Sequence, residues 1–227
     1  MSCSKTSTCL SIIAIGVSVV SIGLTLYKTH PSNVYSSIMK NLEKKQKQEM
    51  EKVKEKADSY IKSNYDSIIL NQPFLGNEKG SKIIVKFSDY NCGHCKNAFK
   101  VLEDYTKQNS DVKVIIQELP ILGKPSFDAA VIAHYIFEKS PEKFVKFHTK
   151  LMSGEGKVSA IDVGVSLGFT KKELESSLTN DKYKEKISSP YKIAQEIGIQ
   201  GTPAFIINKK FLPGYIDKER IDEEFSK

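Results

Sequence analysis

Residues 82–95 read KIIVKFSDYNCGHC, and they place two cysteines where a strand pattern gives way to a helix pattern. The run KIIVKF has the length, apolar content and β-branched residues of a buried strand, and the short turn SDYN follows it. Helical spacing then extends over residues 93–107. Cys92 therefore lies at the N-cap of a predicted helix, where unpaired backbone amides and the helix dipole stabilise an anion. Because the thiolate is the nucleophilic form of cysteine, we expect a reactive thiol here.

Cys95 lies one turn further along this predicted helix, on the face that also carries Phe99 and Leu102. Side chains on that face point towards a core, so Cys95 is expected to be the shielded thiol of the pair. The two sulfurs can close a small disulfide, with Cys92 exposed to attack and Cys95 resolving the intermediate. His94, between them, can add a hydrogen bond or a positive charge beside the thiolate, which favours the reduced form.

Metal binding is the main alternative for a CxxC pair. A structural zinc site needs four ligands, whereas this motif supplies two, so we expect no zinc site here. Two thiolates can hold Cu(I), which leaves a non-catalytic copper-binding protein as an open alternative. An inert buried pair is disfavoured because the strand-to-helix junction exposes the first thiol. The catalytic interpretation requires no cofactor.

The elements downstream of the motif indicate an α/β fold. Residues 112–118 (VKVIIQE) read as a second strand, residues 204–208 as a third, and residues 211–213 as a short return before a closing helix. A helical block, at about 126–198, separates the second strand from the third. The predicted order is strand, helix, strand, helical block, strand, strand, helix.

Two segments in this order, SDYNCGHCKNAF and IGIQGTPAFIIN, resemble the DsbA-type thiol:disulfide oxidoreductases of the thioredoxin superfamily. The resemblance covers about residues 72–227. It implies a thioredoxin fold with an inserted helical domain, and an enzyme whose redox-active disulfide joins Cys92 to Cys95. It also implies that Thr202 and a cis Pro203 face this pair across a substrate groove, in which the Thr202 backbone pairs with an incoming peptide as an added strand.

Some residues depart from the superfamily pattern. Lys86 lies where a buried carboxylate usually assists proton transfer to the inner cysteine. A lysine there either disfavours protons on nearby groups or turns out to solvent. The Gly-His dipeptide of the motif is the one that protein disulfide isomerase uses. The segments DYNCG and ELPILG, with the lysine-rich helix before the domain, resemble the oligomeric suppressor-of-copper-sensitivity branch, whose members can act as isomerases. Formation, reduction and isomerisation of disulfides all remain open.

The amino end carries a membrane-targeting pattern. Residues 1–9 are a predicted cytoplasmic n-region, and residues 10–27 (LSIIAIGVSVVSIGLTLY) contain no charge. Eighteen residues at a rise of about 1.5 Å reach about 27 Å, enough for a signal anchor. A cleaved signal peptide is the alternative, but no clear small-residue cleavage site follows. We therefore expect a periplasmic domain, tethered to the inner membrane or released after cleavage. Its partners would be cysteine-containing exported proteins and a membrane redox partner that reoxidises or reduces the pair.

A helical stalk is predicted over residues 28–66, before the catalytic domain at 67–227. Residues 33–65 contain no Gly or Pro and are rich in Lys, Glu and Gln, which are good helix formers. Two short apolar stripes, one around Ile38 and one around Val53, flank the apolar-free run EKKQKQE. The helix is either a solvated spacer or an oligomerisation segment that would make a homo-oligomer.

The charge of the chain points to no polyanion site. Its formal net charge is +7, but Arg220 is the only arginine among 34 basic residues. Nucleic-acid readers rely on guanidinium groups, so we expect no nucleic-acid partner. His134 and His148 lie at apolar spacing in predicted helices and are expected to be core or surface residues. Tyr90 is expected to pack beside the cysteine motif without reacting.

Overall fold

The computed structural model describes residues 32–154 and 159–227. The predicted n-region at 1–9 and the predicted anchor at 10–27 lie outside these residues. Among the residues described, no helix combines the length and apolar character that crossing a bilayer requires. The chain divides into two units, Met1–Lys56 and Ala57–Lys227, and the cysteine pair lies in the second.

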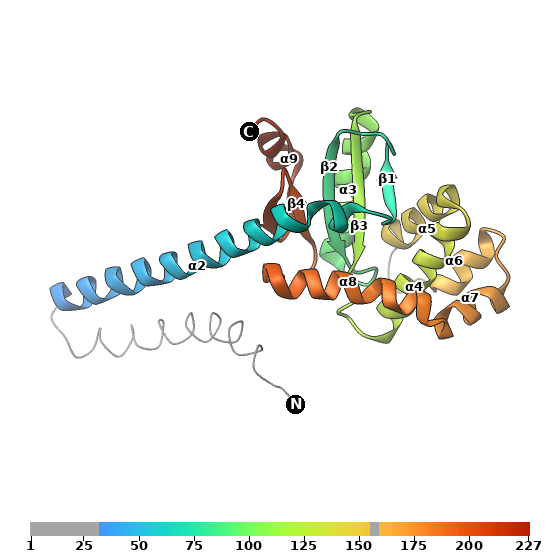
Figure 1. Ribbon diagram of the computed structural model, residues 1–227, viewed down its shortest axis with the longest axis horizontal. Coiled ribbons are helices and arrows are strands. Elements are labelled where there is room, and N and C mark those ends of the chain that lie inside the picture. The colour runs from blue at the N-terminus through green and yellow to red at the C-terminus, as the bar shows by residue number, and fades with distance from the viewer. Residues whose placement is uncertain (1–31, 155–158) are drawn as a thin grey trace. The chain divides into compact units, whose positions relative to one another are not determined.

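Along the sequence, the described strands and helices are interrupted by one run of five consecutive helices between β3 and β4 (Figure 1). They are α2 (Ser32–Ile69), β1 (Phe74–Gly76), β2 (Lys82–Ser88), α3 (Gly93–Gln108), β3 (Val112–Glu118), α4 (Lys124–Lys139), α5 (Pro141–Ser153), α6 (Ala160–Ser166), α7 (Lys171–Thr179), α8 (Asp181–Ile197), β4 (Ala204–Ile207), β5 (Lys210–Pro213) and α9 (Lys218–Phe225). The strands and helices predicted from the sequence are present, with small shifts at their ends. Helix α2 confirms that the segment predicted as a stalk is helical, and its role as a stalk stays a prediction.

Strand β1 was not predicted, because its segment reads as a turn. It is only three residues long, and it ends at Gly76, whose φ of 79° is unfavourable for other residues. This strand forms because it pairs with β3, and not because of a local sequence pattern. Phe74 is opposite Ile115, and the Ile116 amide donates a hydrogen bond to the Pro73 carbonyl at 2.8 Å. The entry to the sheet is therefore a strand and not only a turn.

The five strands form one sheet in the order β1-β3-β2-β4-β5. Strands β2 and β3 are parallel, and the other neighbours are antiparallel. β2 is the central strand, and the cysteine motif follows its carboxyl end. In the β2–β3 register Lys86 is opposite Ile116 and Ser88 is opposite Glu118. The four side chains lie on one face of the sheet, because paired residues of parallel strands point the same way.

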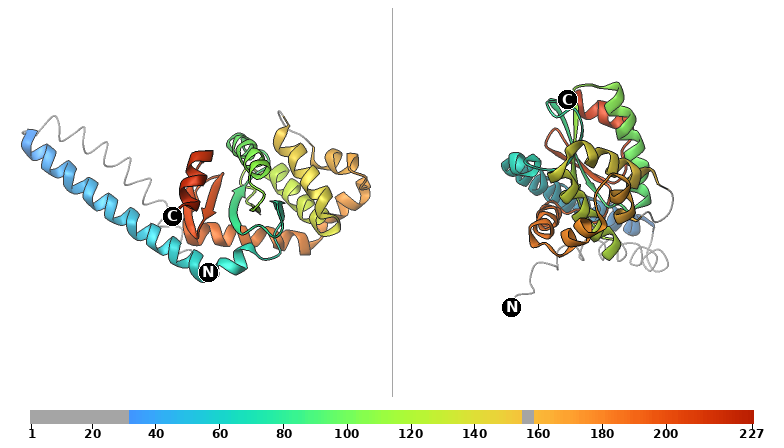
Figure 2. Two further views of the ribbon diagram at one scale, coloured as in Figure 1. Left: turned by 90° about the horizontal axis from the view of Figure 1, so that it is seen from above. Right: turned by 90° about the vertical axis from the view of Figure 1, so that its right-hand side faces the viewer.

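Helices cover both faces of the sheet. One face, with Ile84 of β2, packs in a core with α3, α4 and α5. The other face, with Val85 and Phe87, packs against α8 and the last part of α2. Helices α3 and α8 accordingly lie on opposite sides of the strands (Figure 2). Each face buries alternate residues of a central strand, which explains why the run at 82–87 is apolar throughout.

The second unit begins earlier than the domain start predicted at residue 67. Ala57, Ile61 and Ile68 are buried in the core beneath α8, at 1% exposure or less. The Ile68 carbonyl also accepts a short hydrogen bond from the buried Gln117 side chain. The end of the predicted stalk is therefore part of the second unit, because its apolar residues cover one face of the sheet.

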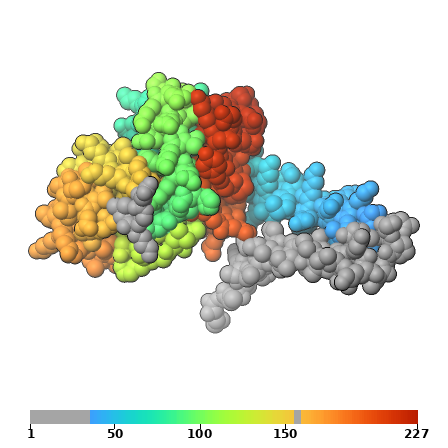
Figure 3. Space-filling view, turned by 180° about the vertical axis from the view of Figure 1, so that it is seen from behind, coloured from blue at the N-terminus to red at the C-terminus, as the bar shows by residue number. Residues whose placement is uncertain are grey.

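The helical insertion consists of α4 to α8. Figure 1 shows α5, α6 and α7 gathered to one side of the sheet, with α8 returning along the sheet to β4. In the space-filling view the insertion, yellow to orange, adjoins the green surface of α3 (Figure 3). A capping box begins α7, where the Thr170 hydroxyl accepts from the Glu173 amide and the Glu173 carboxylate accepts from the Thr170 amide.

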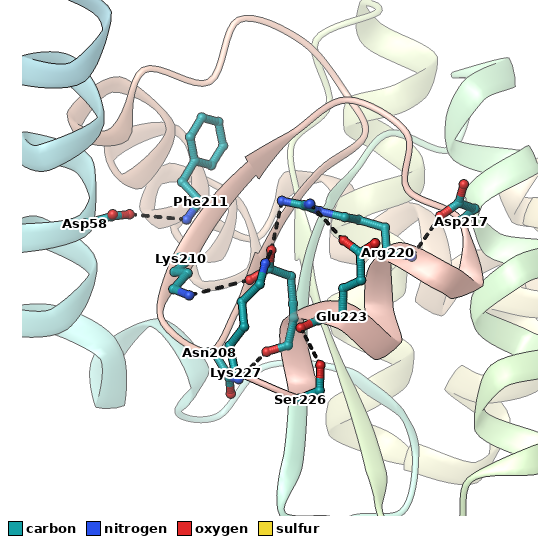
Figure 4. Close-up of polar contacts among 10 residues, drawn as sticks. Asp58, Asn208, Lys210, Phe211, Asp217, Arg220, Glu223, Ser226 and Lys227 are labelled. Atoms are coloured by element: carbon teal, nitrogen blue, oxygen red, sulfur yellow. Dashed lines mark hydrogen bonds and ion pairs between the residues drawn. The ribbon is translucent and has the colours of Figure 1, made fainter.

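The carboxyl end is held by a buried carboxylate, Glu224 of α9, whose partners Lys210, Arg220 and Lys227 are labelled in Figure 4. Its side chain is 2% exposed and forms ion pairs with Lys227 at 2.6 Å, with Arg220 at 2.8 Å and with Lys210 of β5 at 3.7 Å. Arg220, the only arginine in the sequence, therefore makes ion pairs within α9. In the same region the Asp58 carboxylate accepts from the Phe211 amide at 3.4 Å, so α2 also contacts the β4–β5 hairpin.

Candidate active site

Cys92 is the N-cap of α3, as the sequence predicts. Its φ and ψ are −84° and 116°, and its sulfur accepts a hydrogen bond from the Cys95 amide at 3.4 Å. The Cys92 sulfur lies 3.2 Å from the Thr202 carbonyl oxygen, to which it donates when it is protonated, although the two residues are 110 positions apart. The peptide bond between Thr202 and Pro203 is cis. The structure therefore brings together Cys92, Cys95, Thr202 and Pro203, with both cysteines as free thiols.

The environment of Cys92 favours its thiolate. Its pKa is lowered to about 5, chiefly by a hydrogen bond from the Cys95 thiol. Burial opposes this effect, since Cys92 is only 8% exposed. The prediction that this thiol is exposed is therefore wrong, because neighbouring residues cover the start of α3. A hydrogen bond from the Thr202 side chain and the backbone amides of Cys95 and His94 lower the pKa further. At neutral pH the outer sulfur is thus an anion held by donors, as a nucleophile requires.

Cys95 has the opposite protonation preference. It is fully buried, and its pKa is raised by the hydrogen bond that it donates to Cys92 and by burial. The positive charge of Lys86 counteracts these effects in part. An outer thiolate beside an inner thiol is the arrangement in which one cysteine attacks and the other resolves.

Lys86 does not turn out to solvent, which was one of the two alternatives expected from the sequence. It is fully buried, and its ammonium group donates to the Cys95 carbonyl at 3.1 Å. Burial lowers its pKa to about 8, while the charges of Cys95 and Glu118 act in the opposite direction. The Lys86 ammonium group therefore contacts the turn of α3 that carries Cys95.

Glu118 is a residue that sequence reasoning missed. It ends β3, is 1% exposed, and has its pKa raised to about 8 by burial, with Tyr90 and Lys86 opposing. A buried carboxyl group is thus present near Lys86, on the strand beside the one that carries the lysine. The signal that could have found it is an ionisable residue ending an otherwise apolar strand, two residues beyond the partner of Lys86.

Asp89 organises the turn before the motif. Its buried carboxylate accepts from the Asn91 amide at 2.8 Å, the Leu122 amide at 2.9 Å and the Ser126 hydroxyl at 2.7 Å. The Asn91 side chain in turn donates to Ser126 at 2.9 Å. These bonds join the turn to the loop before α4, so the position of Cys92 depends on contacts with the insertion.

The remaining candidates take different places. The His94 side chain is exposed in the first turn of α3, and its ring makes no hydrogen bond to any residue that the structure describes. His134 and His148 are buried, with their pKa values lowered mainly by burial. Tyr90 packs beside the motif, and its hydroxyl lies 2.9 Å from Nδ1 of His148. His134 and His148, which we expected to be core or surface residues, are therefore core residues.

Metal ligands do not gather at the site. Over residues 32–154 and 159–227, no group of three or more His, Cys, Asp or Glu residues could hold a metal ion. The pair Cys92 and Cys95 remains the only part of this site with thiol donors in the described chain. The geometry favours thiol chemistry, in which the two sulfurs exchange a bond.

Comparison with known proteins agrees with this geometry. A family model described as thioredoxin matches residues 69–226. The chain belongs to the thioredoxin family. Disulfide bond formation protein D of Bacillus subtilis is 26% identical over 172 residues, which cover 70% of this chain and 78% of the relative.

Two solved structures extend the similarity of this thioredoxin-family protein. The catalytic domain of Proteus mirabilis ScsC superposes with a TM-score of 0.68 at 28% identity, covering 75% of this chain and 99% of that domain. A periplasmic thioredoxin-like protein from Salmonella enterica serovar Typhimurium gives a TM-score of 0.63 at 29% identity, covering 71% and 95%. With these relatives and its CGHC pair, the thioredoxin-family chain is a protein disulfide oxidoreductase, and the predicted DsbA-type resemblance is confirmed.

Proposed function

We propose that this oxidoreductase exchanges disulfides with other proteins through Cys92 and Cys95. In the reductive direction the Cys92 thiolate attacks a substrate disulfide, forms a mixed disulfide and releases one substrate thiolate. Cys95 then attacks the Cys92 sulfur, which closes the internal disulfide and releases the second substrate thiolate. Oxidation is the reverse sequence. The observation that supports this proposal is the split protonation of the pair, an outer thiol of lowered pKa against a buried inner thiol.

The substrate groove is proposed at Thr202 and Pro203. The Thr202 carbonyl already contacts the Cys92 thiol, so a peptide carrying a cysteine can reach the same sulfur beside this backbone. An added peptide strand would gain main-chain hydrogen bonds there with little dependence on its sequence. A cavity of about 360 Å³ also opens beside Tyr90 and Asn91, with Ile132 and Leu151 among its lining residues. It offers space for an apolar substrate side chain.

His94 is proposed to bias the direction of exchange. Its side chain is exposed in the first turn of α3, beside the proposed thiolate. When protonated, it would favour the anion and so the reduced form, making the disulfide a stronger oxidant. The redox state of Cys92 and Cys95 in intact cells, trapped by alkylation, separates the possibilities. A mostly oxidised pair indicates a disulfide donor, and a mostly reduced pair indicates an isomerase or reductase.

The cellular setting is proposed to be the periplasm. Support comes from the uncharged segment at 10–27 and from the similarity to a Salmonella protein described as periplasmic. Exported cysteine-containing proteins would be the substrates, and a membrane redox partner would restore the pair. A homo-oligomer would bring several sites together, which would benefit an isomerase. Light scattering of the chain with and without residues 33–56 tests this, because Ala57 and later residues belong to the catalytic unit.

Trapping of the mixed disulfide tests the proposed mechanism. Cys95→Ala leaves the attacking thiol but removes the resolving one, so substrates should accumulate as adducts linked to Cys92. Non-reducing gels of alkylated cell extracts would show these adducts, and the double variant with Cys92→Ala is the matched control. Normal disulfide exchange by Cys92→Ala, with no adduct in Cys95→Ala, would refute the mechanism. Tight Cu(I) binding without turnover would favour the copper-binding alternative.

A further inference from the structure

A second cavity borders the edge strand β1, and none of its lining residues belongs to the cysteine motif. Its volume of about 590 Å³ is in the range that ligand-binding sites occupy. Apolar residues of α2, β1 and α4 line it, among them Leu70, Phe74 and Phe137. Lys113 also lines it, near the start of β3. The cysteine motif follows β2 beside the other end of β3, at Glu118, which is about 17 Å away along an extended strand.

Strand β1 has an edge that no other strand covers. It is the first strand in the sheet order, at one side of the sheet (Figure 1). The Asn77 amide donates to the Val112 carbonyl at 2.9 Å, and hydrogen-bonded positions alternate along an antiparallel pair. The N–H and C=O groups of Phe74 and Gly76 therefore point away from β3. Among the residues described, no other backbone segment pairs with these groups.

The wall of the cavity has unmet hydrogen-bonding capacity. Nε2 of His134 and Oε1 of Gln72 are buried without a hydrogen-bond partner among the described residues. Both residues line the cavity, and His134 is only 4% exposed. Burial and the charge of Lys186 lower the pKa of His134 to about 4, so its ring is uncharged at pH 7. Because buried polar atoms without a partner are rare and costly, a polar group bound at this wall would be stabilised.

The charges around the cavity balance. Glu138 is paired with Lys182 at 2.6 Å. The other charged residues of the lining are two acids and two lysines, Asp66, Glu78, Lys113 and Lys186. The site therefore offers no net charge to an ion. An apolar cavity beside a row of outward N–H and C=O groups matches an extended polypeptide, which supplies both an apolar side chain and the complementary backbone groups.

We propose that β1 and this cavity form a second polypeptide-binding site, in which an extended segment of a substrate protein pairs with Phe74 and Gly76 and places an apolar side chain in the cavity. Polypeptides are the molecules on which a protein disulfide oxidoreductase acts, so they are the occupant that this enzyme meets. A segment held at β1 would raise the effective concentration of the same chain's cysteine near Cys92. The inference goes beyond the proposed exchange step, and the binding itself involves no thiol.

Binding of a cysteine-free peptide tests this site without disulfide exchange. The probe is a short, fluorescently labelled peptide of Thr and Ser with one central Phe, and the matched peptide has Ser in place of Phe. Fluorescence anisotropy with the reduced full chain gives the Kd of each peptide. Leu70→Asp places a charge at the cavity wall, where Leu70 is 64% exposed. Val165→Asp, at an exposed apolar position of α6 outside the cavity, is the matched control.

The Phe peptide should bind about ten-fold or more tightly than the Ser peptide, because burial of an aromatic side chain contributes at least that factor. Leu70→Asp should weaken binding of the Phe peptide by a similar factor, and Val165→Asp should leave its Kd unchanged. Hydrogen exchange followed by NMR gives an independent measurement on the wild type. The peptide should slow exchange of the Phe74 and Gly76 amides, whereas the Leu75 amide, which faces β3, should change less.

The outcomes decide between this occupant and others. Equal Kd values in wild type and Leu70→Asp overturn the proposal, and so does unchanged exchange of the Phe74 and Gly76 amides on addition of the Phe peptide. If Leu70→Asp does not fold by circular dichroism, the exchange measurement on the wild type decides. Slow exchange of these two amides without peptide would identify a second copy if it depends on protein concentration, or a segment of the same chain if it does not; either result overturns the proposal. Loss of exchange activity at Cys92 with peptide binding intact refutes the proposed function and supports a separate site.

Discussion

Replacing Cys95 by alanine should raise the pKa of Cys92. The hydrogen bond from the Cys95 thiol is the largest cause that brings the Cys92 pKa from 9.0 down to about 5. Alanine removes this donor but leaves the backbone amides and the hydrogen bond from Thr202. The new pKa should therefore lie between the two values. A thiol donor so close to a sulfur stabilises the anion, so its loss favours the protonated form.

The size of the effect decides which quantity to measure. At pH 7 a thiol of pKa about 5 is about 99% thiolate, whereas one of pKa 9 is about 1% thiolate. This is about a hundred-fold range in the reactive fraction. A thiolate of lower pKa is also intrinsically less nucleophilic, with a Brønsted slope of about 0.4–0.5. Over the four units between pKa 5 and pKa 9, this lowers the rate constant of the thiolate by about 40- to 100-fold, which offsets most of the gain in thiolate fraction. The rate at pH 7 is thus nearly insensitive to the change, and the midpoint of the pH profile carries the information.

Alkylation of Cys92 by iodoacetamide between pH 3 and pH 10 gives this midpoint. In the reduced wild type it should lie near pH 5, and in Cys95→Ala it should lie higher by one pH unit or more, on the order of one lost hydrogen bond to a charged group. Cys95→Ser is the matched variant, because its hydroxyl keeps a donor at the same place and should hold the midpoint closer to that of wild type.

Two results would refute this reasoning. A wild-type midpoint above pH 8 would show that the N-cap position and its donors do not stabilise the thiolate. An equal midpoint in wild type and Cys95→Ala would show that the thiol-to-thiol hydrogen bond is not the main cause, and that the helix amides and Thr202 act alone.

Three further predictions concern stability, each measured by urea unfolding. Glu224→Gln should lower the free energy of unfolding by about 1–3 kcal/mol, because a buried carboxylate paired with cations loses its charge. The matched variant Glu223→Gln, at the exposed neighbouring position, should change the free energy of unfolding by at most about 1 kcal/mol. Equal losses in the two variants would contradict this prediction. Thr170→Ala should cost about 1 kcal/mol through loss of the α7 cap, and no change would mean that the cap is not needed. Gly76→Ala should cost more than about 1 kcal/mol, since its φ is 79° and a Cβ would lie 2.5 Å from the Val112 carbonyl; a neutral or stabilising result would contradict that geometry.

Much of the site was predictable because its signals are local. The apolar run at 82–87 predicts the strand, and the turn and helix that follow predict the N-cap position of Cys92 and the inward face of Cys95. All of these signals lie within about fourteen residues of sequence. The place of Thr202 and Pro203 opposite the cysteines followed from resemblance to a family, since no local pattern links residues 110 positions apart.

The missed features depend on contacts between distant segments. Strand β1 forms because β3 offers its edge to Phe74–Gly76, and a segment of three residues has no periodicity of its own. The compact unit starts at Ala57 because one face of the sheet needs a cover, and the stripe that provides it reads equally well as part of a solvated stalk.

The sequence alone determined that Cys92 begins a helix and that Cys95 points inward from it, because capping and helical periodicity act within one turn. Only the tertiary structure decided the chemistry around Cys95. The parallel register of β2 and β3 places Glu118 on the same buried face as Lys86, and the exclusion of water there makes the protonation of each group depend on the others. Such coupling exists only when the sheet and its covering helices are assembled.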